Sequence, residues 1–510
     1  MPVELIVDGR PVVVENEAAN LLEVLREQCG IASVKDGCAP QGQCGCCTVL
    51  VDGQARVSCV TPVRRISGRS ITTVDGLPEE ERAAWADALT ATGGSQCGFC
   101  TPGIICRMSA MRADEVAVSD PKFGNGLAAH LCRCTGWQSI AEAYDGYGKR
   151  RELDPWRAAR RAELEGGVPQ QVGPHVALGE GGFSTDTIPP DAWFAVPTVD
   201  DEWVVRSSLR EAREASGKVQ GRRTTVASEP PIDVPECPDG EWHLTLQTSW
   251  VEPAPLETET VWCVPGGEPS SLVANGGAFG AKSGRNLGDI ARHHSDLIGH
   301  PVAVVLSRED SVRLGAKRPP LAAGVTADGH GIVHVARTSG IVDAIRSRAN
   351  RLEIVEVDVA GPPTSAAIRG AGWVEAAILM SALLSPDHED RVASPDGAGA
   401  GASLEEDGIH VTVNAGTPLD DTVLRSYCVG AAHMAYSWVT SESLAVDSDG
   451  SVHDLTIRSF DIVRASDTPP IHVEIIDSDA EPINGSDAVF AAVAAATWRA
   501  RGYSPVWPSG

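Results

Sequence analysis

Eight cysteines in the first third of the chain fall into two groups of four. The first group has the spacing C-x5-C-x2-C-x11-C and consists of Cys38, Cys44, Cys47 and Cys59. The second has the spacing C-x2-C-x31-C-x-C and consists of Cys97, Cys100, Cys132 and Cys134. Four thiolates can hold a [2Fe-2S] cluster or a structural zinc ion. The pattern therefore predicts two metal centres, one for each quartet.

The loop around the first quartet favours iron–sulfur chemistry. Its spacing resembles the plant-type ferredoxin pattern, C-x4-C-x2-C with a distant fourth cysteine, but has one more residue in the first gap. Gly37, Gly42 and Gly45 allow the backbone to turn closely around inorganic sulfide. Disulfides fit poorly, because nothing in the sequence indicates secretion. Zinc stays open as the alternative, since C-x2-C pairs suit it equally well.

Residues 1–150 resemble the iron–sulfur subunit of the molybdenum hydroxylases, the family of xanthine dehydrogenase, aldehyde oxidase and carbon monoxide dehydrogenase. The strings that carry the resemblance are DGCAPQGQCGCCTVLVDG and SQCGFCTPG…HLCRCTG. The resemblance implies a ferredoxin-like domain and then a four-helix domain, each with one [2Fe-2S] cluster. In the family, the glutamine of Q-C-G-x-C approaches the pterin of the molybdenum cofactor. Gln96 has that position here, and a polar helix cap is its alternative role.

A fifth cysteine departs from the family pattern. Cys46 lies where the family usually has a small apolar residue, and it could compete as a ligand. Cys44 and Cys47 keep the family's C-G-x-C spacing, so we predict that these two are the ligands.

The second half of the chain resembles, more weakly, the molybdopterin-binding subunit of the same family. The matching strings include TSWVEPAPLE (248–257), NGGAFGAK (275–282), IRGAG (368–372) and EPINGSDAVFAAVAAA (481–496). The resemblance implies that the cofactor is approached by a glycine loop containing Gly276, Gly277, Phe279 and Gly280, with Phe279 near the substrate. It also places Arg369 at the active site, where an Arg could orient an oxyanion. A structural turn with a surface Arg is the alternative.

The candidate general base also departs from the family. The family uses a Glu in a G-x-G-E motif, whereas the best-aligned string here ends in Asp487, whose side chain is one methylene shorter. A general base misplaced by about 1 Å can cost on the order of 100-fold in rate. Asp487 is therefore either a weak or displaced base or the N-cap of the following helix. This region also has only about half the usual length, and a pterin-contacting segment of the family has no clear counterpart.

Local patterns predict the elements that position the quartets. Asp-Gly turns predict hairpins over residues 3–14 and around Asp52-Gly53, with a helix over 20–29 between them. Further helices are expected over 79–92, from Pro102 to about Arg112 and over 137–148. Each half of the second quartet then lies at a helix terminus, where amide groups can donate to sulfur.

The predicted fold class is α+β multidomain, with a β-grasp ferredoxin-like domain, a four-helix domain and a mixed α/β molybdopterin-binding-like region. The expected parts are a plant-type [2Fe-2S] ferredoxin-like domain over 1–76, a helical [2Fe-2S]-binding domain over 77–150, a charged linker over 151–172 and a shortened molybdopterin-binding-like region over 173–510. We expect the linker to be a solvated helix. The glycine-rich, acidic residues 385–408 are expected to form a surface loop.

Composition narrows the possible partners and surroundings. The 510 residues carry a net charge of −27, which disfavours a nucleic-acid partner. No apolar run approaches the about 18 residues of a membrane span. The N-terminus has the pattern of a strand and turn rather than of a signal peptide. Many cysteines without an export signal fit the reducing cytoplasm.

These features predict the iron–sulfur electron-transfer component of a molybdenum-hydroxylase-type oxidoreductase. Electrons would pass from a molybdenum centre through two [2Fe-2S] clusters to FAD or another acceptor. FAD is expected on a partner subunit and molybdenum on a large subunit, with an aldehyde or N-heterocycle as substrate. One alternative is a self-contained hydroxylase with molybdopterin in residues 173–510. Another is a non-catalytic scaffold that holds zinc.

Overall fold

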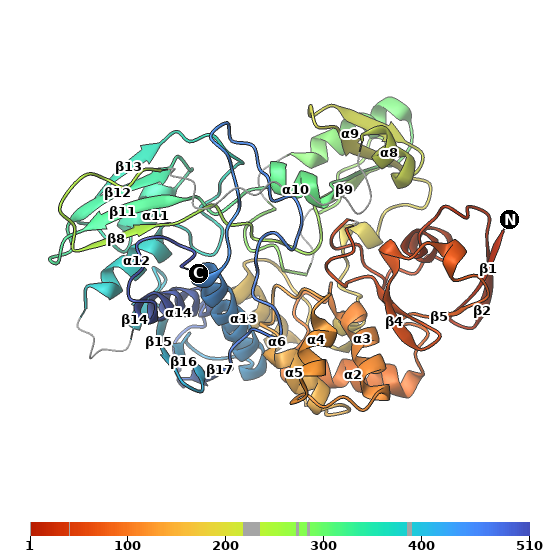
Figure 1. The fold of residues 1–510 in the computed structure, drawn as a ribbon, viewed down its shortest axis with the longest axis horizontal. Helices are drawn as coiled ribbons and strands as arrows, with labels where there is room; N and C mark the ends of the chain where they lie inside the picture. Colours follow the sequence, from red (N-terminus) through yellow and green to blue (C-terminus); the bar gives the residue numbers. More distant parts are fainter. Residues whose placement is uncertain are drawn as a thin grey trace.

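The computed structural model describes residues 2–39, 41–217, 235–271, 275–282, 286–384 and 390–509. The chain has mixed α/β structure, in which four sheets are arranged around central helices (Figure 1). The elements of residues 1–150, red to orange, lie at one side of the molecule. The sheet of residues 244–357 and the sheet of residues 390–475 lie at the other. The predicted fold class is confirmed. Across the described residues, no helix has both the length and the apolar character needed to cross a membrane.

The first sheet is formed near the N-terminus and has the strand order β2-β1-β5-β3-β4. Its strands are β1 (Val3–Val7), β2 (Arg10–Val14), β3 (Thr48–Val51), β4 (Gln54–Val57) and β5 (Ser70–Thr72). Both predicted hairpins are confirmed, and Asp8, Gly9, Asp52 and Gly53 all have positive φ, as primed hairpin turns require. The predicted helix begins at α1 (Leu21–Glu23), which Asn20 caps, and continues as a π-helical turn (Val24–Gln28).

The second quartet belongs to a group of four helices. They are α2 (Glu79–Thr92), α3 (Thr101–Ala113), α4 (Pro121–Leu127) and α5 (Gln138–Asp145). Pro102 lies in the first turn of α3, as predicted, where its missing N–H breaks no helical hydrogen bond. Trp85 of α2 is fully buried and contacts the ring of Tyr144 in α5 and that of Tyr147 just after it, so α2 packs against α5.

The helix that follows is not the solvated linker that its charge predicts. Helix α6 (Pro155–Gly166) has two fully buried charged side chains, Arg161 and Glu165, which form an ion pair of 3.0 Å. Arg161 also donates to the carbonyl oxygens of Pro418 and Ile483 at 2.8 Å each. The charges of α6 therefore face the C-terminal half of the chain as well as solvent, and the prediction of a fully solvated helix is wrong.

The middle of the chain forms two further sheets. One has the order β7-β6-β10-β9 and consists of β6 (Trp193–Pro197), β7 (Trp203–Arg206), β9 (Thr260–Cys263) and β10 (Val302–Val305). The other has the order β13-β12-β11-β8 and consists of β8 (Leu244–Gln247), β11 (Leu321–Val325), β12 (Gly331–Ala336) and β13 (Leu352–Val357). The helices of this region are α7 (Pro174–Ala177), α8 (Leu209–Ala215), α9 (Leu287–Ile298), α10 (Arg308–Leu314), α11 (Ile341–Arg346) and α12 (Trp373–Ala382).

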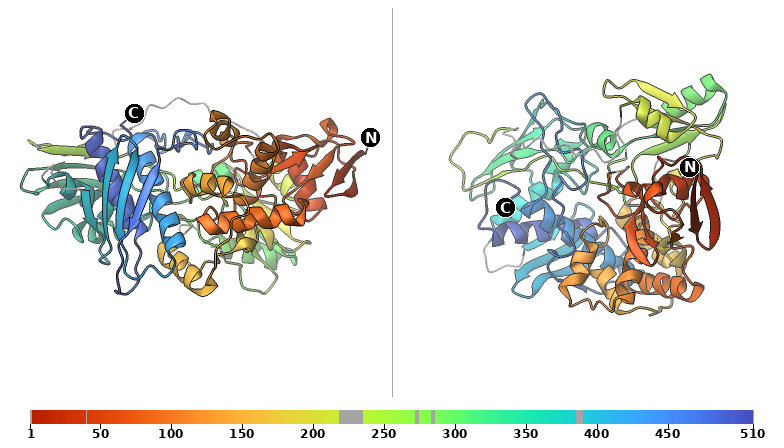
Figure 2. Two further views of the ribbon diagram at one scale, coloured as in Figure 1. Left: turned by 90° about the horizontal axis from the view of Figure 1, so that it is seen from below. Right: turned by 45° about the vertical axis from the view of Figure 1, so that its right-hand side comes forward.

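The last sheet packs against two largely buried helices. Its strands, in spatial order, are β14 (Asp390–Ala393), β15 (Gly399–Glu405), β16 (Gly408–Asn414) and β17 (Ile471–Ile475). The helices are α13 (Asp421–Thr440) and α14 (Ser486–Ala500), which contact one face of this sheet (Figure 2). The expected surface loop over 385–408 is therefore wrong from residue 390 onward, and residues 385–389 lie outside the described part. Small side chains such as Ala400 and Ala402 are buried because the alanine-rich α14 packs closely on β15.

Candidate metal centres and active site

The four side chains of the first quartet are buried and lie close together. Cys38, Cys44 and Cys47 lie in the loop before β3, and Cys59 follows β4. The Cys38 thiol is hydrogen-bonded to the thiols of Cys44 and Cys59, and the Cys59 thiol is also hydrogen-bonded to that of Cys47. The bonds from Cys44 and Cys59 hold the pKa of Cys38 well below its usual range. The backbone N–H of Gln41 donates to Cys38 Sγ at 3.1 Å, so amide donors already point at this sulfur.

The second quartet is assembled from two helix termini. Cys97 and Cys100 precede α3, while Cys132 and Cys134 lie between α4 and α5. The Sγ atoms of Cys97 and Cys134 are 3.6 Å apart, and the thiols of Cys100 and Cys132 are hydrogen-bonded. The bond from Cys100 lowers the pKa of Cys132 to about 7. All four side chains are buried, which suits a group held by thiolates and shielded from water.

Cys46 is also buried and lies between the two quartets. Its Sγ atom is 3.8 Å from the carbonyl oxygen of Cys44, and its thiol is hydrogen-bonded to the Cys44 thiol. It also interacts electrostatically with Cys97 of the second quartet. The two quartet loops touch at Gly103 of α3, where a Cβ atom would lie 2.4 Å from the carbonyl oxygen of Gly45. Only glycine at position 103 allows this close contact.

A cavity of about 140 Å³ lies beside the second quartet and joins most of the other predicted site residues. Six of them line it, namely Gln96, Gly277, Phe279, Gly280, Arg369 and Asp487. Gly276 does not, because its Cα faces Gln170, whose side chain would lie 2.6 Å from an added Cβ. A Cβ on Gly277 would lie 3.2 Å from Cys97 Sγ. The glycine loop therefore lies on the wall of the cavity and close to the second quartet.

Arg369 and Asp487 form an ion pair across this cavity. Arg369 Nη1 is 3.1 Å from Asp487 Oδ1 and 3.2 Å from Ser486 Oγ. The Arg369 side chain is only 9% exposed and lies over the ring of Phe279, with 5.3 Å from the guanidinium carbon to the ring centroid. Arg369 thus has a largely buried side chain, which contradicts the exposed arginine of the alternative. Its φ of +46° is a strained conformation for a non-glycine residue.

Asp487 is not the helix N-cap. The N-cap of α14 is Gly485, and the backbone N–H of Asp487 donates to Asn484 Oδ1 at 3.0 Å. The end of the helix is instead satisfied by Glu165 of α6, whose carboxylate accepts from Ser486 N–H at 2.8 Å. Burial raises the pKa of Glu165, and the adjacent Arg161 opposes that shift. The Asp487 carboxylate is thereby left to face Arg369 and the cavity.

Gln96 connects the second quartet to the C-terminal half. Its side-chain amide donates to the carbonyl oxygen of Cys134 at 3.0 Å and to Ser426 Oγ of α13 at 2.8 Å. It is not the cap of α3, since Cys100 is at that position. The same helix α13 approaches the quartet at Gly430, where a Cβ atom would lie 1.8 Å from the Cys134 carbonyl oxygen.

Three polar residues of the cavity were missed in the sequence. They are Glu165, Tyr427 and Asn484. Glu165 is hidden within a charged run and Tyr427 within an apolar helix, so neither had a local signal. Asn484 lies three residues before Asp487 in the string that aligns with the family's general base, and its position there was the only available indication.

Comparisons with known proteins agree with this arrangement. Residues 73–145 match the family model described as a [2Fe-2S] binding domain. The chain is 45% identical over 123 residues to the xanthine dehydrogenase iron-sulfur-binding subunit of Escherichia coli O157:H7, covering 24% of this chain and 76% of that protein. It is 36% identical over 140 residues to the isoquinoline 1-oxidoreductase subunit alpha of Brevundimonas diminuta, covering 27% of this chain and 91% of that protein.

The whole chain also has the fold of a solved enzyme. The structure of the aldehyde oxidoreductase from Desulfovibrio desulfuricans ATCC 27774 matches with a TM-score of 0.72 at 12% identity, covering 100% of this chain and 99% of that one. At this identity the match shows the fold alone. Taken with the two subunits above, it shows that the chain belongs to the molybdenum hydroxylase family, which includes xanthine dehydrogenases and aldehyde oxidoreductases.

Proposed function

We propose that the chain transfers electrons in a molybdenum hydroxylase complex, with the two quartets as ligands of two [2Fe-2S] clusters. The observation that carries the proposal is the closeness of Gly277, on the wall of the cavity, to Cys97 of the second quartet, whose Sγ would lie 3.2 Å from a Cβ atom added to Gly277. It brings a candidate substrate site and a candidate redox centre within one side chain of each other. A [2Fe-2S] cluster supplies one-electron transfer when bound.

The residues present fit such clusters. Each quartet offers four buried sulfur atoms, linked by hydrogen bonds between neighbouring thiols, and each has a polar donor at a sulfur atom. Gln41 N–H donates to Cys38, and Thr135 Oγ1 lies 3.0 Å from Cys132 Sγ. Donors of this kind stabilise the extra negative charge of a reduced cluster, so these residues should raise its potential. We assign Cys44 and Cys47, and not Cys46, as ligands.

We propose the same division of the chain as the sequence suggests. The β-grasp part would cover residues 1–76 and the helical part 77–150, with α6 in a connecting segment over 151–172. Residues 173–510 would form the molybdopterin-binding-like part. This division is supported by the first sheet, which uses only strands before residue 73, and by the four helices between residues 79 and 145.

The cavity has suitable donors for a pterin cofactor but little space. Arg369 brings guanidinium N–H groups to it, whereas the amide N–H groups of Gln96 and Asn484, which also line it, already donate to Cys134, Ser426, Glu165 and Asp487. Its volume of about 140 Å³ is below the ~300–1,000 Å³ of typical sites for ligands of that size. The described lining alone therefore does not enclose the whole cofactor. We therefore infer that a molybdenum-binding partner subunit completes the site and that a further partner carries FAD.

Within this site we assign Asp487 as the acceptor of a substrate or water proton. Its Oδ1 is engaged by Arg369, which keeps the carboxylate oriented toward the cavity. Apart from a long contact of 3.5 Å with Asn484 Nδ2, its Oδ2 has no hydrogen bond to the described residues, so this oxygen is left for a ligand. Arg369 would then stabilise negative charge that develops beside it.

A self-contained aldehyde or N-heterocycle hydroxylase is the second candidate. One observation favours it: the fold match to an aldehyde oxidoreductase extends over the full chain rather than over the first third. No observation in the described residues favours a zinc scaffold over iron–sulfur clusters.

One experiment separates these functions. The chain is purified anaerobically, alone and after co-expression with candidate molybdenum and flavin subunits, and is analysed for iron, labile sulfide, molybdenum and pterin. We expect clusters in both samples, and molybdenum and substrate-dependent cluster reduction only in the complex. Molybdopterin and turnover in the isolated chain would establish the self-contained enzyme. Stoichiometric zinc without labile sulfide would contradict both.

A further inference from the structure

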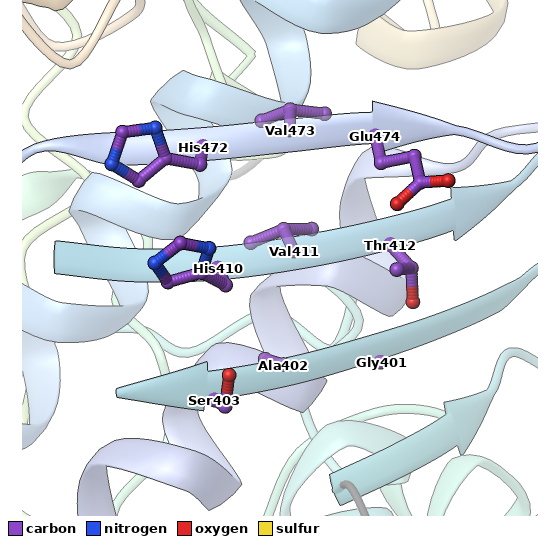
Figure 3. A pocket seen from close by; sticks show the side chains of 9 residues that line it. All are labelled: Gly401, Ala402, Ser403, His410, Val411, Thr412, His472, Val473 and Glu474. Carbon is purple, nitrogen blue, oxygen red and sulfur yellow. The ribbon is translucent and has the colours of Figure 1, made fainter. Parts of the chain in front are cut away.

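Two histidines and an aspartate lie together on the outer face of the last sheet, far in sequence from both quartets. The inner face of this sheet is covered by α13 and α14, whereas the outer face has a groove of about 210 Å³. Figure 3 shows His410 and His472 at one end of this groove and Thr412 and Glu474 at the other. Outside the two cysteine quartets, Asp407 and these two histidines are the one group of three His, Cys, Asp or Glu residues in the described parts of the chain whose ligand atoms all lie within 4.8 Å of one another.

Strand register fixes the two imidazoles beside each other. β16 and β17 are parallel neighbours in which His410 is paired with His472, so both side chains leave the same face at the same level. Their ring centroids are 4.6 Å apart, and the ring planes differ by 27°. Both are outside the apolar core, so their pairing is not explained by packing.

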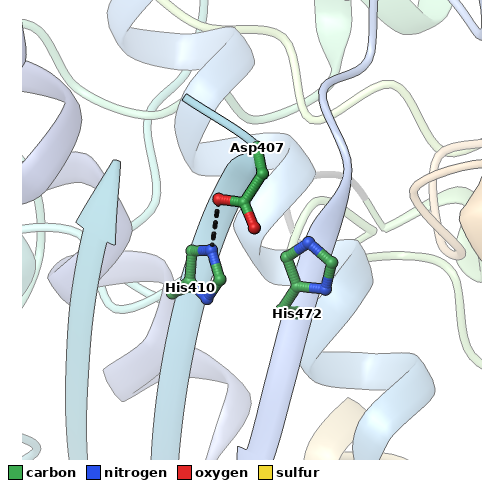
Figure 4. A group of neighbouring side chains, drawn as sticks. All are labelled: Asp407, His410 and His472. Atoms are coloured by element: carbon green, nitrogen blue, oxygen red, sulfur yellow. Dashed lines mark hydrogen bonds and ion pairs between the residues drawn. The ribbon is translucent and has the colours of Figure 1, made fainter. Parts of the chain in front are cut away.

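Asp407 adds a carboxylate from the turn that leads into β16. Its Oδ1 lies 2.8 Å from His410 Nε2, and its side chain points toward the pair of rings (Figure 4). One ligand atom from each of the three residues lies within 4.8 Å of the other two. An ion bound at roughly 2.0–2.2 Å from each ligand needs ligand atoms closer together than this, and small rotations of exposed side chains can bring them there.

We propose that Asp407, His410 and His472 bind a divalent transition-metal ion such as Zn²⁺. Two imidazole nitrogens and one carboxylate oxygen are a ligand set that suits Zn²⁺ and its neighbours, whereas Ca²⁺ and Mg²⁺ prefer oxygen ligands throughout. Three protein ligands leave at least one coordination position open toward the groove. Water, or an anionic or hydroxyl-bearing ligand in the groove, can fill it.

The simpler interpretation is a surface ion pair, and the chain itself provides examples. His330 pairs with Asp328 at 3.1 Å, and His453 pairs with Asp447 at 2.7 Å. Neither belongs to a group of three such residues in the described chain. The second histidine is what distinguishes the proposed site, since an ion pair between Asp407 and His410 has no need of His472.

Metal binding here has a defined structural effect. β17 is the edge strand of the sheet, and an ion held by His410 and His472 connects it to β16. The first residue of β17, Ile471, exchanges two hydrogen bonds with Gln138 of α5, at 2.7 and 2.8 Å. An ion would therefore stabilise the edge strand that docks on the helices of the second quartet.

The test uses the full chain with its clusters loaded. Cys237 is exposed and would offer a competing thiolate, so every variant carries Cys237→Ser. Chelator-washed protein is titrated with Zn²⁺ by equilibrium dialysis. We expect about one Zn²⁺ per chain beyond the clusters, with affinity at least about tenfold lower in His472→Ala and in Asp407→Asn. His330→Ala, at the exposed ion pair, is the matched control and should bind as the parent does.

A second readout identifies the ligands directly. Cu²⁺ is added to oxidised protein, whose [2Fe-2S] clusters give no EPR signal, and the nitrogen hyperfine pattern is recorded. Two equivalent imidazole nitrogens are expected in the parent and one in His472→Ala. Circular dichroism and iron content should be unchanged in all variants, because the substituted side chains are outside the core. Equal Zn²⁺ binding by the parent and by the His410→Ala/His472→Ala double variant would overturn the proposal, whatever the clusters do.

Discussion

Arg133 and Glu442 form a buried, bidentate ion pair that connects the second quartet to the C-terminal half. The Nη1 and Nη2 atoms of Arg133 donate to the two carboxylate oxygens of Glu442 at 2.6 Å each. The side chains are 5% and 2% exposed. Arg133 lies between Cys132 and Cys134, and its Nε donates to the carbonyl oxygen of Pro253 at 3.2 Å. The quartet loop is therefore anchored to the later part of the chain through Pro253 and Glu442.

Removing Glu442 should destabilise this junction. In Glu442→Ala a buried guanidinium loses its charge partner, which costs about 3–5 kcal/mol. We expect a lower urea midpoint and an altered EPR signal from the second cluster, with the first cluster's signal preserved. Glu79→Ala removes an exposed i,i+3 partner of Arg82 and should change stability by less than about 1 kcal/mol. Equal effects of the two changes would show that burial of the pair is unimportant.

Each quartet should lose its cluster independently. In Cys132→Ser, iron and labile sulfide should fall from about four to about two per chain, because the first quartet uses none of these ligands. Iron and sulfide analysis with EPR of the reduced protein measures this. Loss of both clusters would mean that the second quartet is needed to fold the first.

Cys46 and Cys44 should differ sharply when replaced. The Cys44 thiol is hydrogen-bonded to Cys38 within the first quartet. The Cys46 thiol, among the thiols of that quartet, is hydrogen-bonded only to Cys44. Cys46→Ala should therefore keep both clusters, and Cys44→Ala should lose the first. The reverse result, read from the same EPR signals, would make Cys46 the ligand.

Asp487 should matter for turnover rather than for assembly. In the reconstituted complex, Asp487→Ala should lower kcat by a factor of about 10²–10⁴, the range for loss of a positioned general base. Cluster content should stay the same, since Asp487 contacts neither quartet. Asp479→Ala, an exposed acidic residue before the same helix, serves as the control. Unchanged turnover in Asp487→Ala would remove this residue from the proposed site.

Stability should fall in mild acid, in part through His433. Burial lowers the pKa of His433 to about 4, so this histidine is neutral in the folded chain, and its Nε2 lies 3.0 Å from the carbonyl oxygen of Val463. The unfolded chain takes up the proton near pH 6.5, so the contribution to stability is full above that pH. It is lost at about 1.4 kcal/mol per pH unit down to pH 4.

Urea unfolding between pH 7 and pH 4.5 measures this loss. His433→Gln should be less stable at pH 7 but should show a shallower dependence on pH. The exposed His175→Gln should keep the parental slope. A parental slope in His433→Gln would show that other groups cause the acid sensitivity.

The sequence predicted what is encoded locally. The Asp8-Gly9 and Asp52-Gly53 turns, and the spacing of the quartets, depend on residues close together in the chain, and the structure has them as expected. The buried state of Glu165 could not be predicted in this way, because its partner N–H groups at Gly485 and Ser486 lie over 300 residues away. The glycine and alanine of β15 suggest a flexible loop, whereas in the folded chain they make room for α14.

The burial of α6 has a consequence for assembly. The two relatives described above are named as subunits, and the match to each covers only about a quarter of this chain. In this chain the iron–sulfur part and the cavity belong to one polypeptide, and α6, with its fully buried Arg161 and Glu165, connects them. A covalent connection replaces a bimolecular encounter by an intramolecular one, with an effective concentration in the millimolar range for short connections. Dilution therefore cannot separate the second quartet from the cavity. Each molecule has one iron–sulfur part for each cavity, whatever the protein concentration.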